Sequence, residues 1–383
     1  MTNSEKTNLS GIYIHVPFCQ SRCIYCDFYS TVYGEDFKDR YVERLLKEMA
    51  DRKNEVDSLV DTIYVGGGTP SCLHTGRIEK IMSHLIQNFS LADNPEITLE
   101  ANPDDVTPSF VKQLVDIGIN RVSLGVQTFD DERLRFIRRR HSSRQAVKAV
   151  HTLVENGIDN VSIDLIFGFP NESVESWKKD LEQALSLPVK HLSAYSLMFE
   201  EGTLLTHMRD SGQIEEIDED LSLRMYDVLL DMTEKKGMEH YEISNFSYPG
   251  FRSHHNSKYW MGAPYVGFGP GAHSFNGVNV RRSNNSDLKS YIQSSDEVPH
   301  EIEMLGVDEL CDEFVFTSLR TKEGLDTRLL LSKFGVERFN KIIVAAEAHV
   351  KSGLLKEASG HLSFTHKGFF LSDLVMSDMM IVE

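Results

Sequence analysis

Cysteine is scarce in this chain of 383 residues, and basic residues are fewer than acidic ones. The five cysteines are an odd number, which does not fit a disulfide framework and indicates a reducing compartment. Forty lysines and arginines against 58 acidic residues give a net charge of −18. Such an acidic surface repels phosphate backbones, so we expect no nucleic-acid partner.

Long apolar runs are also absent. No stretch approaches the roughly 18 uninterrupted apolar residues that a membrane-spanning helix needs. The polar stretch Met1–Ser10 lacks the apolar segment of a signal peptide. We therefore expect a cytoplasmic protein with a short disordered lead over residues 1–10. With 40% apolar residues, the chain can build a large α/β domain and a smaller second one.

Short apolar runs alternate with longer amphipathic stretches through residues 11–238, where we place the first domain. Strands are predicted over Gly11–Val16, Asp61–Val65, Glu96–Glu100, Arg121–Val126, Val161–Ile166 and His191–Leu197. Helices are predicted between and after them, including Phe37–Arg52, Ile78–Phe89, Ser109–Ile117, Ser143–Asn156, Val174–Leu187 and Leu221–Lys236. This alternation predicts a partial (β/α)6 TIM-like barrel of the α/β class, with its chemistry at the carboxyl ends of the strands.

The pattern changes in the last third of the chain. Residues 239–300 are rich in Gly, Asn, Ser, Tyr and Trp, and we expect an irregular linker region there. Residues 301–383 predict a C-terminal, mainly helical domain. Its helices are followed by two short strands near Leu354–Glu357 and His361–Phe364, an order that resembles a winged helix.

Three cysteines stand together directly after the first predicted strand. Cys19, Cys23 and Cys26 form a CxxxCxxC loop. Each iron of a [4Fe-4S] cubane needs an outer ligand, and cysteine thiolate is the usual one, so three cysteines leave one iron open. An open iron can chelate the amine and carboxylate of S-adenosylmethionine (SAM). The alternative is a structural zinc site with His15 as fourth ligand.

The loop, and the βα series that follows it, resemble the radical SAM superfamily. Within it the chain resembles the family of oxygen-independent coproporphyrinogen III oxidase, which includes a haem-chaperone branch. The resemblance extends from Gly11 to about Asp373. Polar residues at successive strand ends also indicate a pocket floor, namely Glu100, Gln127 and Asp164. The resemblance implies that SAM contacts Tyr13, Tyr25, Gly67, Gly68, Thr69, Glu100, Gln127, Arg139, Asp164 and Met198.

Two features favour the haem-chaperone branch over the oxidases. Oxidases of this family carry an additional cysteine two positions after the third ligand, where this chain has Phe28. The segment His255–Trp260 reads HNxxYW, a string typical of the chaperone branch. Histidine ligates haem iron, and aromatic rings stack on a porphyrin, so His255, Tyr259 and Trp260 are the candidate haem residues. His254 and His273 remain alternative ligands.

The resulting hypothesis is a haem chaperone that carries a [4Fe-4S] cluster, SAM and haem. By resemblance its cargo goes to haem-requiring respiratory acceptor proteins, with transient contact to a membrane protein, and the chaperone is a monomer or a homodimer. The alternative function is oxygen-independent coproporphyrinogen III dehydrogenase, an enzyme activity that Phe28 argues against. A radical SAM enzyme acting on tRNA is a further alternative, which the net charge disfavours.

Overall fold

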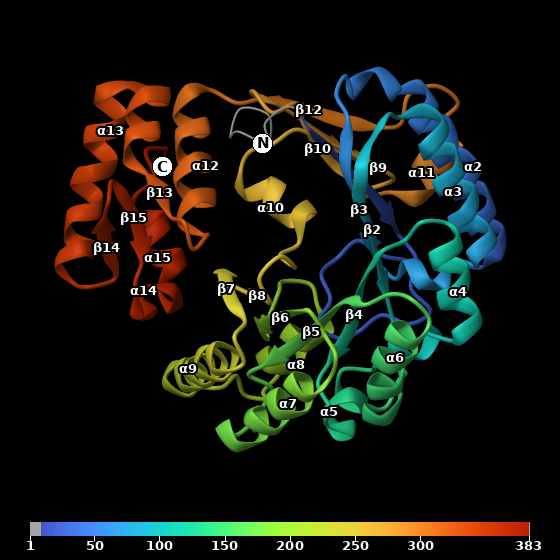
Figure 1. The fold of residues 1–383 in the computed structure, drawn as a ribbon, viewed down its shortest axis with the longest axis horizontal. Helices are drawn as coiled ribbons and strands as arrows, with labels where there is room; N and C mark the ends of the chain where they lie inside the picture. Colours follow the sequence, from blue (N-terminus) through green and yellow to red (C-terminus); the bar gives the residue numbers. More distant parts are fainter. Residues whose placement is uncertain (1–8, 383) are drawn as a thin grey trace.

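The computed structural model describes residues 9–382, and its centre is a parallel sheet in which consecutive strands are neighbours (Figure 1). All five pairings from β1 to β6 are parallel. The strands are β1 (Ser10–Val16), β2 (Val60–Gly67), β3 (Leu91–Ala101), β4 (Arg121–Gln127), β5 (Asn160–Phe167) and β6 (His191–Ser196). The predicted partial (β/α)6 barrel is thereby confirmed.

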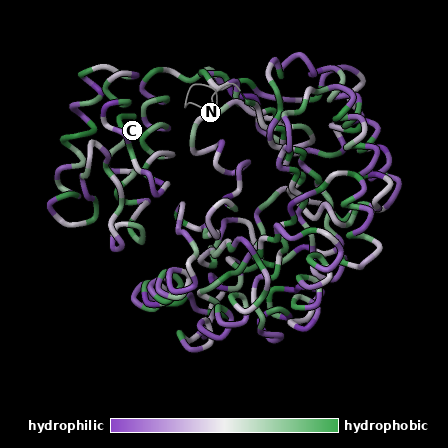
Figure 2. Tube along the Cα trace, in the orientation of Figure 1, coloured by the Kyte–Doolittle hydropathy of each residue, from purple (hydrophilic) through white to green (hydrophobic). Residues whose placement is uncertain are grey.

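Amphipathic helices cover the outside of this sheet (Figure 1). Their apolar faces and the outward faces of the strands form the main hydrophobic core, which contains Ile12, Leu45 and Trp177. Figure 2 shows hydrophobic strands inside and hydrophilic stretches on the outer helices. The helices are α2 (Glu35–Asp51), α3 (Thr75–Asn88), α4 (Pro108–Asp116), α5 (Asp131–Phe136), α6 (Ser143–Glu155), α7 (Val174–Ser186), α8 (Leu204–Asp210) and α9 (Glu219–Lys235).

The expectation of an irregular segment over residues 239–300 is wrong. The segment extends the sheet at both edges, with β8 and β7 beyond β6 and β9 parallel to β1. Strands of three to five residues are too short to show a clear period of two, and β9 joins the sheet by pairing with β1, far away in the sequence. The elements are β7 (Glu239–Glu242), β8 (Asn245–Ser247), α10 (His254–Trp260), β9 (Tyr265–Phe268), β10 (His273–Phe275), β11 (Val280–Asn284), α11 (Leu288–Gln293) and β12 (His300–Met304).

The C-terminal module has its own hydrophobic core, which includes Cys311, Leu330 and Phe364. Gly335 has a φ of +80° inside α13, so this stretch is two helices joined by a kink. Three short strands form a separate antiparallel sheet. The elements are α12 (Val307–Leu319), β13 (Leu325–Asp326), α13 (Thr327–Lys351), β14 (Leu355–Ala358), β15 (His361–Phe364), α14 (His366–Phe370) and α15 (Ser372–Asp378).

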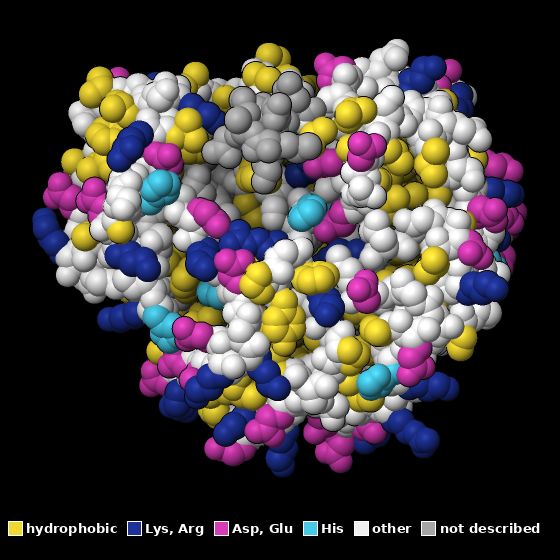
Figure 3. All heavy atoms as spheres, viewed as in Figure 1, with side chains coloured by type: hydrophobic (Ala, Val, Ile, Leu, Met, Phe, Trp, Pro, Cys, Tyr) yellow, Lys and Arg dark blue, Asp and Glu magenta, His cyan; other side chains and the backbone are white. Residues whose placement is uncertain are grey.

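Most of the expected N-terminal lead, residues 1–8, lies outside the described residues, and Ser10 already belongs to β1. Among residues 9–382, no helix is long and apolar enough to cross a bilayer. Acidic and basic side chains are mixed over the face shown in Figure 3. On this side of the molecule, acidic side chains are therefore interspersed with basic ones.

Candidate functional site: a cysteine-rimmed cavity in the barrel

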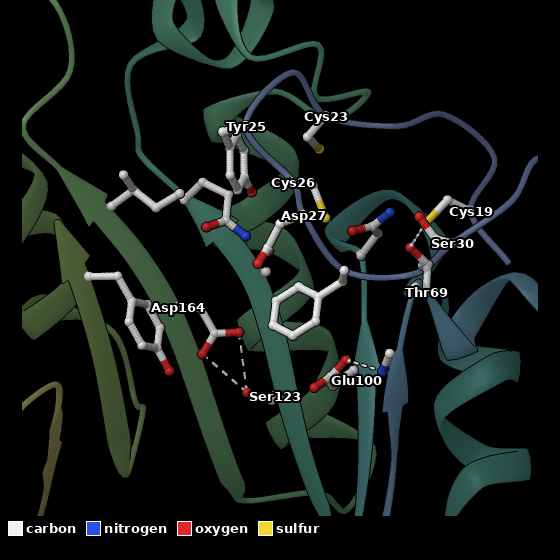
Figure 4. Close-up of a pocket in the computed structure, with 18 of the residues that line it drawn as sticks. Cys19, Cys23, Tyr25, Cys26, Asp27, Ser30, Thr69, Glu100, Ser123 and Asp164 are labelled. Carbon is white, nitrogen blue, oxygen red and sulfur yellow. Dashed lines mark hydrogen bonds between the residues drawn. The ribbon is translucent and has the colours of Figure 1, made fainter. Parts of the chain in front are cut away.

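A cavity of about 390 Å³ opens at the carboxyl ends of the parallel strands. The CxxxCxxC loop lies along one side of it, and polar residues of β3, β4 and β5 lie across from the loop (Figure 4). In barrels of parallel strands this end carries the chemistry, because loops from every strand converge there. The site therefore lies where the sequence predicts it.

Cys19, Cys23 and Cys26 all line this cavity. The loop is tied down by a backbone hydrogen bond from Cys19 N to Thr31 O at 2.8 Å, and Thr69 Oγ1 lies 3.4 Å from Cys19 Sγ. Within residues 9–382, no three His, Cys, Asp or Glu side chains are grouped closely enough to hold one metal ion. Three cysteines that line one cavity fit a [4Fe-4S] cluster, whose irons take cysteine thiolates as outer ligands.

The zinc alternative fails at His15. Its ring is buried, with Nδ1 3.0 Å from Tyr13 Oη and Nε2 2.9 Å from Tyr29 O. Burial lowers the pKa of this imidazole from its ordinary value. Both ring nitrogens are already occupied, so His15 does not complete a tetrahedral site with the cysteines.

The three glycines that end β2 lie directly beside the cysteine loop. A Cβ on Gly68 would lie 2.6 Å from Phe18 O and 3.1 Å from Cys19 Sγ. A Cβ on Gly66 would lie 2.9 Å from Glu100 Oε1. Glycine is therefore required at these positions, because the cysteine loop, the end of β2 and the Glu100 carboxylate approach one another closely. A tight turn alone would not explain this requirement.

The floor of the cavity is acidic and half-buried. Tyr64 Oη donates to Glu100 Oε1 at 2.8 Å, and Gly67 N donates to Glu100 Oε2 at 3.1 Å. Burial raises the pKa of Glu100 to about 7, against these two hydrogen bonds. Ser123 Oγ donates to both carboxylate oxygens of Asp164, whose pKa burial also raises (Figure 4). Two carboxyl groups that face this cavity are suited to bind hydroxyl and amine groups.

Gln127 ends β4 with a φ of +69°, which is uncommon for a residue other than glycine. The register of β4 against β5 shifts between Gly125 and Gln127, so a bulge turns this residue. The Gln127 side chain lines the cavity. Strained backbone at the end of a strand points to a functional position.

Arg139 joins the floor to the cysteine rim. Its guanidinium donates to Asn102 Oδ1 at 2.6 Å and to Gly125 O at 2.5 Å. Its Nη1 also lies 3.5 Å from Cys23 Sγ. A buried guanidinium beside a thiol stabilises negative charge on the sulfur.

Most residues expected to contact SAM line this one cavity, and Tyr13 does not. The hydroxyl of Tyr13 is bonded to His15 instead. Cys72 is buried, with its Sγ 3.5 Å from Phe18 O, and lies outside the lining. The expected residues that do line the cavity are Tyr25, Gly67, Gly68, Thr69, Glu100, Gln127, Arg139, Asp164 and Met198.

Sequence reasoning missed Arg121, a buried guanidinium at the start of β4 that lines the cavity. Its positive charge lowers the pKa of both Glu100 and Asp164 in opposition to burial. The sequence could have indicated Arg121, because alternate residues of a strand lie on one face. This face of β4 carries Arg121, Ser123, Gly125 and Gln127. All four line the cavity.

The HNxxYW segment forms the helix α10, and His255 is not available as a haem ligand in this conformation. Its side chain is 1% exposed, with Nδ1 3.0 Å from Thr62 Oγ1 and Nε2 2.9 Å from Tyr259 Oη. It stacks on Tyr64, and burial lowers its pKa to about 3. In this conformation both ring nitrogens of His255 are hydrogen-bonded and the ring is buried, so neither nitrogen is free to bind iron.

The fold and the cysteine-rimmed cavity define the class of radical SAM proteins, and residues 13–184 match the family model of the Radical SAM superfamily. The heme chaperone HemW of Lactococcus lactis subsp. lactis is 34% identical over 374 residues, covering 97% of each chain. That of Bacillus subtilis is 32% identical over 377 residues, covering 96% of this chain and 98% of the relative. The chain therefore belongs to the HemW family of radical SAM proteins.

A solved structure shares the fold across almost the whole chain. Coproporphyrinogen III oxidase (HemN) from Escherichia coli has a TM-score of 0.85 and 22% sequence identity. The match covers 98% of this chain and 91% of that one. It extends the shared architecture beyond the barrel to the C-terminal module.

Proposed function

We propose that this protein is a haem chaperone that binds haem and passes it to haem-requiring acceptor proteins in the cytoplasm or at the respiratory membrane. The observation that carries the proposal is the likeness, over nearly the full length, to relatives named heme chaperone HemW. The retained HNxxYW segment supports it, because Tyr259 and Trp260 place aromatic rings beside a second cavity. A porphyrin offers flat apolar faces on which such rings stack.

The first cavity would hold a [4Fe-4S] cluster on Cys19, Cys23 and Cys26 and SAM beside it. When bound, the cluster supplies an open iron that chelates the amine and carboxylate of SAM. The backbone of Gly67 and Gly68 approaches closely, Glu100 and Asp164 accept hydrogen bonds, and Arg139 balances charge near Cys23. These residues orient the ligand and keep it out of bulk water.

The oxidase alternative is disfavoured at Phe28. This residue lines the first cavity and is 63% exposed, where the oxidases of the family carry an extra cysteine. A phenyl ring can neither ligate iron nor transfer a proton. Incubation with coproporphyrinogen III, SAM and a reductant should therefore give no protoporphyrinogen, and its formation would establish the enzyme instead.

The proposal is tested by anaerobic purification with iron, sulfide and haem analysis. Cys23→Ala should lose nearly all of the oxygen-sensitive cluster absorbance, because a cubane rarely survives on two thiolates. Cys311→Ala, in the separate C-terminal core, is the matched control and should keep the full iron and sulfide content. Haem titration of the wild-type protein, followed by mixing with an apo-haemoprotein, then measures binding and transfer. A wild type that takes up no haem would refute the chaperone function.

A further inference from the structure

A second cavity, of about 850 Å³, lies between the sheet edge, α10 and the C-terminal module. Figure 1 shows α10 between the C-terminal helices and the strands of the barrel. Its size is within the range of roughly 300–1,000 Å³ that is usual for small-molecule and cofactor sites. The two cavities are separate, because they have no lining residue in common. Helix α10 contributes Asn256 to the first cavity, and Tyr259 and Trp260 to the second.

The floor of this cavity is one face of the strands β9, β10 and β11. Phe275 is paired with Tyr265 on one side and with Arg281 on the other, and paired residues share a face. His273 is two positions before Phe275 and therefore lies on the same face. All four residues line the cavity, so an imidazole and a guanidinium stand on an otherwise aromatic surface.

The walls are aromatic and come from distant parts of the chain. Phe314 and Phe316 belong to α12, Phe334 to α13 and Trp260 to α10. Trp260 Nε1 and Arg281 Nε are buried without a hydrogen-bond partner among the described residues. Buried donors left unpaired are costly, and both atoms belong to side chains that line the cavity.

The polar groups of the cavity match a metalloporphyrin with carboxylate side chains. His273 Nδ1 lies 2.9 Å from Ser283 Oγ, and no hydrogen bond within residues 9–382 involves its Nε2. With Nδ1 donating to Ser283, Nε2 presents its lone pair, the arrangement usual for a metal-bound histidine. Arg281 and Lys333 add positive charge at the same cavity, and Arg281 already pairs with Glu313 at 2.8 Å.

We propose that this second cavity is the haem seat and that His273, rather than His255, is the axial ligand. This inference rests on the proposed function, which supplies haem as the cargo. The aromatic walls stack on the porphyrin, and Arg281 and Lys333 pair with its carboxylates. His255 is then a positioning residue, because its Nε2 holds the hydroxyl of Tyr259 at the cavity wall.

Haem titration at the Soret band tests the assignment in the full-length protein loaded with its cluster. His273→Ala should weaken haem binding about tenfold or more, the loss expected for one strong contact, and should shift the Soret maximum. His254→Ala, an exposed histidine of α10, is the matched control and should bind haem as the wild type does.

A cavity-filling variant tests the seat without touching the ligand. Thr317→Trp places an indole in the cavity and should abolish haem binding while the iron and sulfide content of the cluster stays unchanged. Val307→Trp, exposed at the start of the same helix, should have no effect. Melting curves of all variants identify any that fail to fold.

The outcomes separate the two proposals. A wild type without affinity for haem refutes the chaperone function itself. If the wild type binds haem and His273→Ala and Thr317→Trp bind it equally well, the function stands and the seat is elsewhere. If folded His255→Ala loses the axial ligand signal and His273→Ala keeps it, the ligand assignment is overturned.

Discussion

At the scale of single residues, the carboxyl group of Glu100 lies in surroundings that favour its neutral form. Its pKa is about 7 because burial outweighs the two hydrogen bonds that it accepts and the charge of Arg121. The neighbouring Asp164 is shifted in the same direction by the same cause. Strongly perturbed carboxyl groups in a cleft are typical of binding and catalytic sites.

Replacing Glu100 by Gln should flatten the dependence of stability on pH. Between pH 4.5 and about 7 the unfolded chain ionises Glu100 while the folded chain keeps its proton, so wild-type stability falls as pH rises. The fall from this group is about 3 kcal/mol, and it is largely complete by about pH 8. Urea midpoints at pH 5 and pH 8 should differ less in Glu100→Gln than in the wild type. Glu43→Gln, exposed on α2, should behave as the wild type; an equal pH dependence in all three proteins would contradict the argument.

At the scale of elements, the site depends on the close approach of the end of β2 to the cysteine loop. Gly68 N donates to Val16 O at 2.8 Å and Thr69 N donates to Phe18 O at 2.7 Å. These backbone bonds hold the loop against the strand. The approach is possible because Gly68 has no side chain.

Gly68→Ala should therefore displace the cysteine loop. Its methyl group would lie 2.6 Å from Phe18 O, and relief of this overlap costs about 1–3 kcal/mol. We expect a clear loss of cluster content, measured as iron and sulfide per chain after anaerobic reconstitution. Gly76→Ala in α3 meets no atom within 4 Å and should stabilise the protein by about 1 kcal/mol. Full cluster content in Gly68→Ala would show that the loop does not need this approach.

At the scale of the whole molecule, the C-terminal module is joined to the barrel by a buried ion pair. Arg320, at the end of α12, donates to Glu242 Oε2 of β7 at 3.2 Å, and the Glu242 side chain is 0% exposed. The same guanidinium lies 4.6 Å from the ring centroid of Trp260. One residue thus connects the module, the sheet edge and the second cavity.

Arg320→Ala should lower the free energy of unfolding by about 3 kcal/mol, because it leaves a buried carboxylate without its charge partner. The backbone N–H of Ser244 still donates a hydrogen bond to this carboxylate, so the loss stays below the roughly 5 kcal/mol at the top of the usual range for a broken buried ion pair. Lys322→Ala breaks only an exposed pair with Glu239 and should cost less than about 1 kcal/mol. Denaturation followed by intrinsic fluorescence compares the two. Equal effects would mean that the junction depends on other contacts.

The sequence by itself determined the parallel sheet, the order of its strands and the position of the three-cysteine loop. These features can be predicted from the local spacing of residues, because apolar periodicity and the sequence separation of the cysteines do not depend on contacts with remote parts of the chain. It also singled out Glu100 and Asp164 on two of the predicted strands, and both line the first cavity. The alternation of residues along β4 could have predicted Arg121 as a cavity residue in the same way.

Only the tertiary structure decided the surroundings of the HNxxYW segment and the existence of the second cavity. Short strands such as β9 and β10 carry no clear period, and their side chains meet α12 and α13 from far along the chain. The burial of His255 between Thr62 and Tyr259 likewise comes from packing between distant elements. Burial and hydrogen bonding, which no local pattern encodes, determine which histidine is free to bind a ligand.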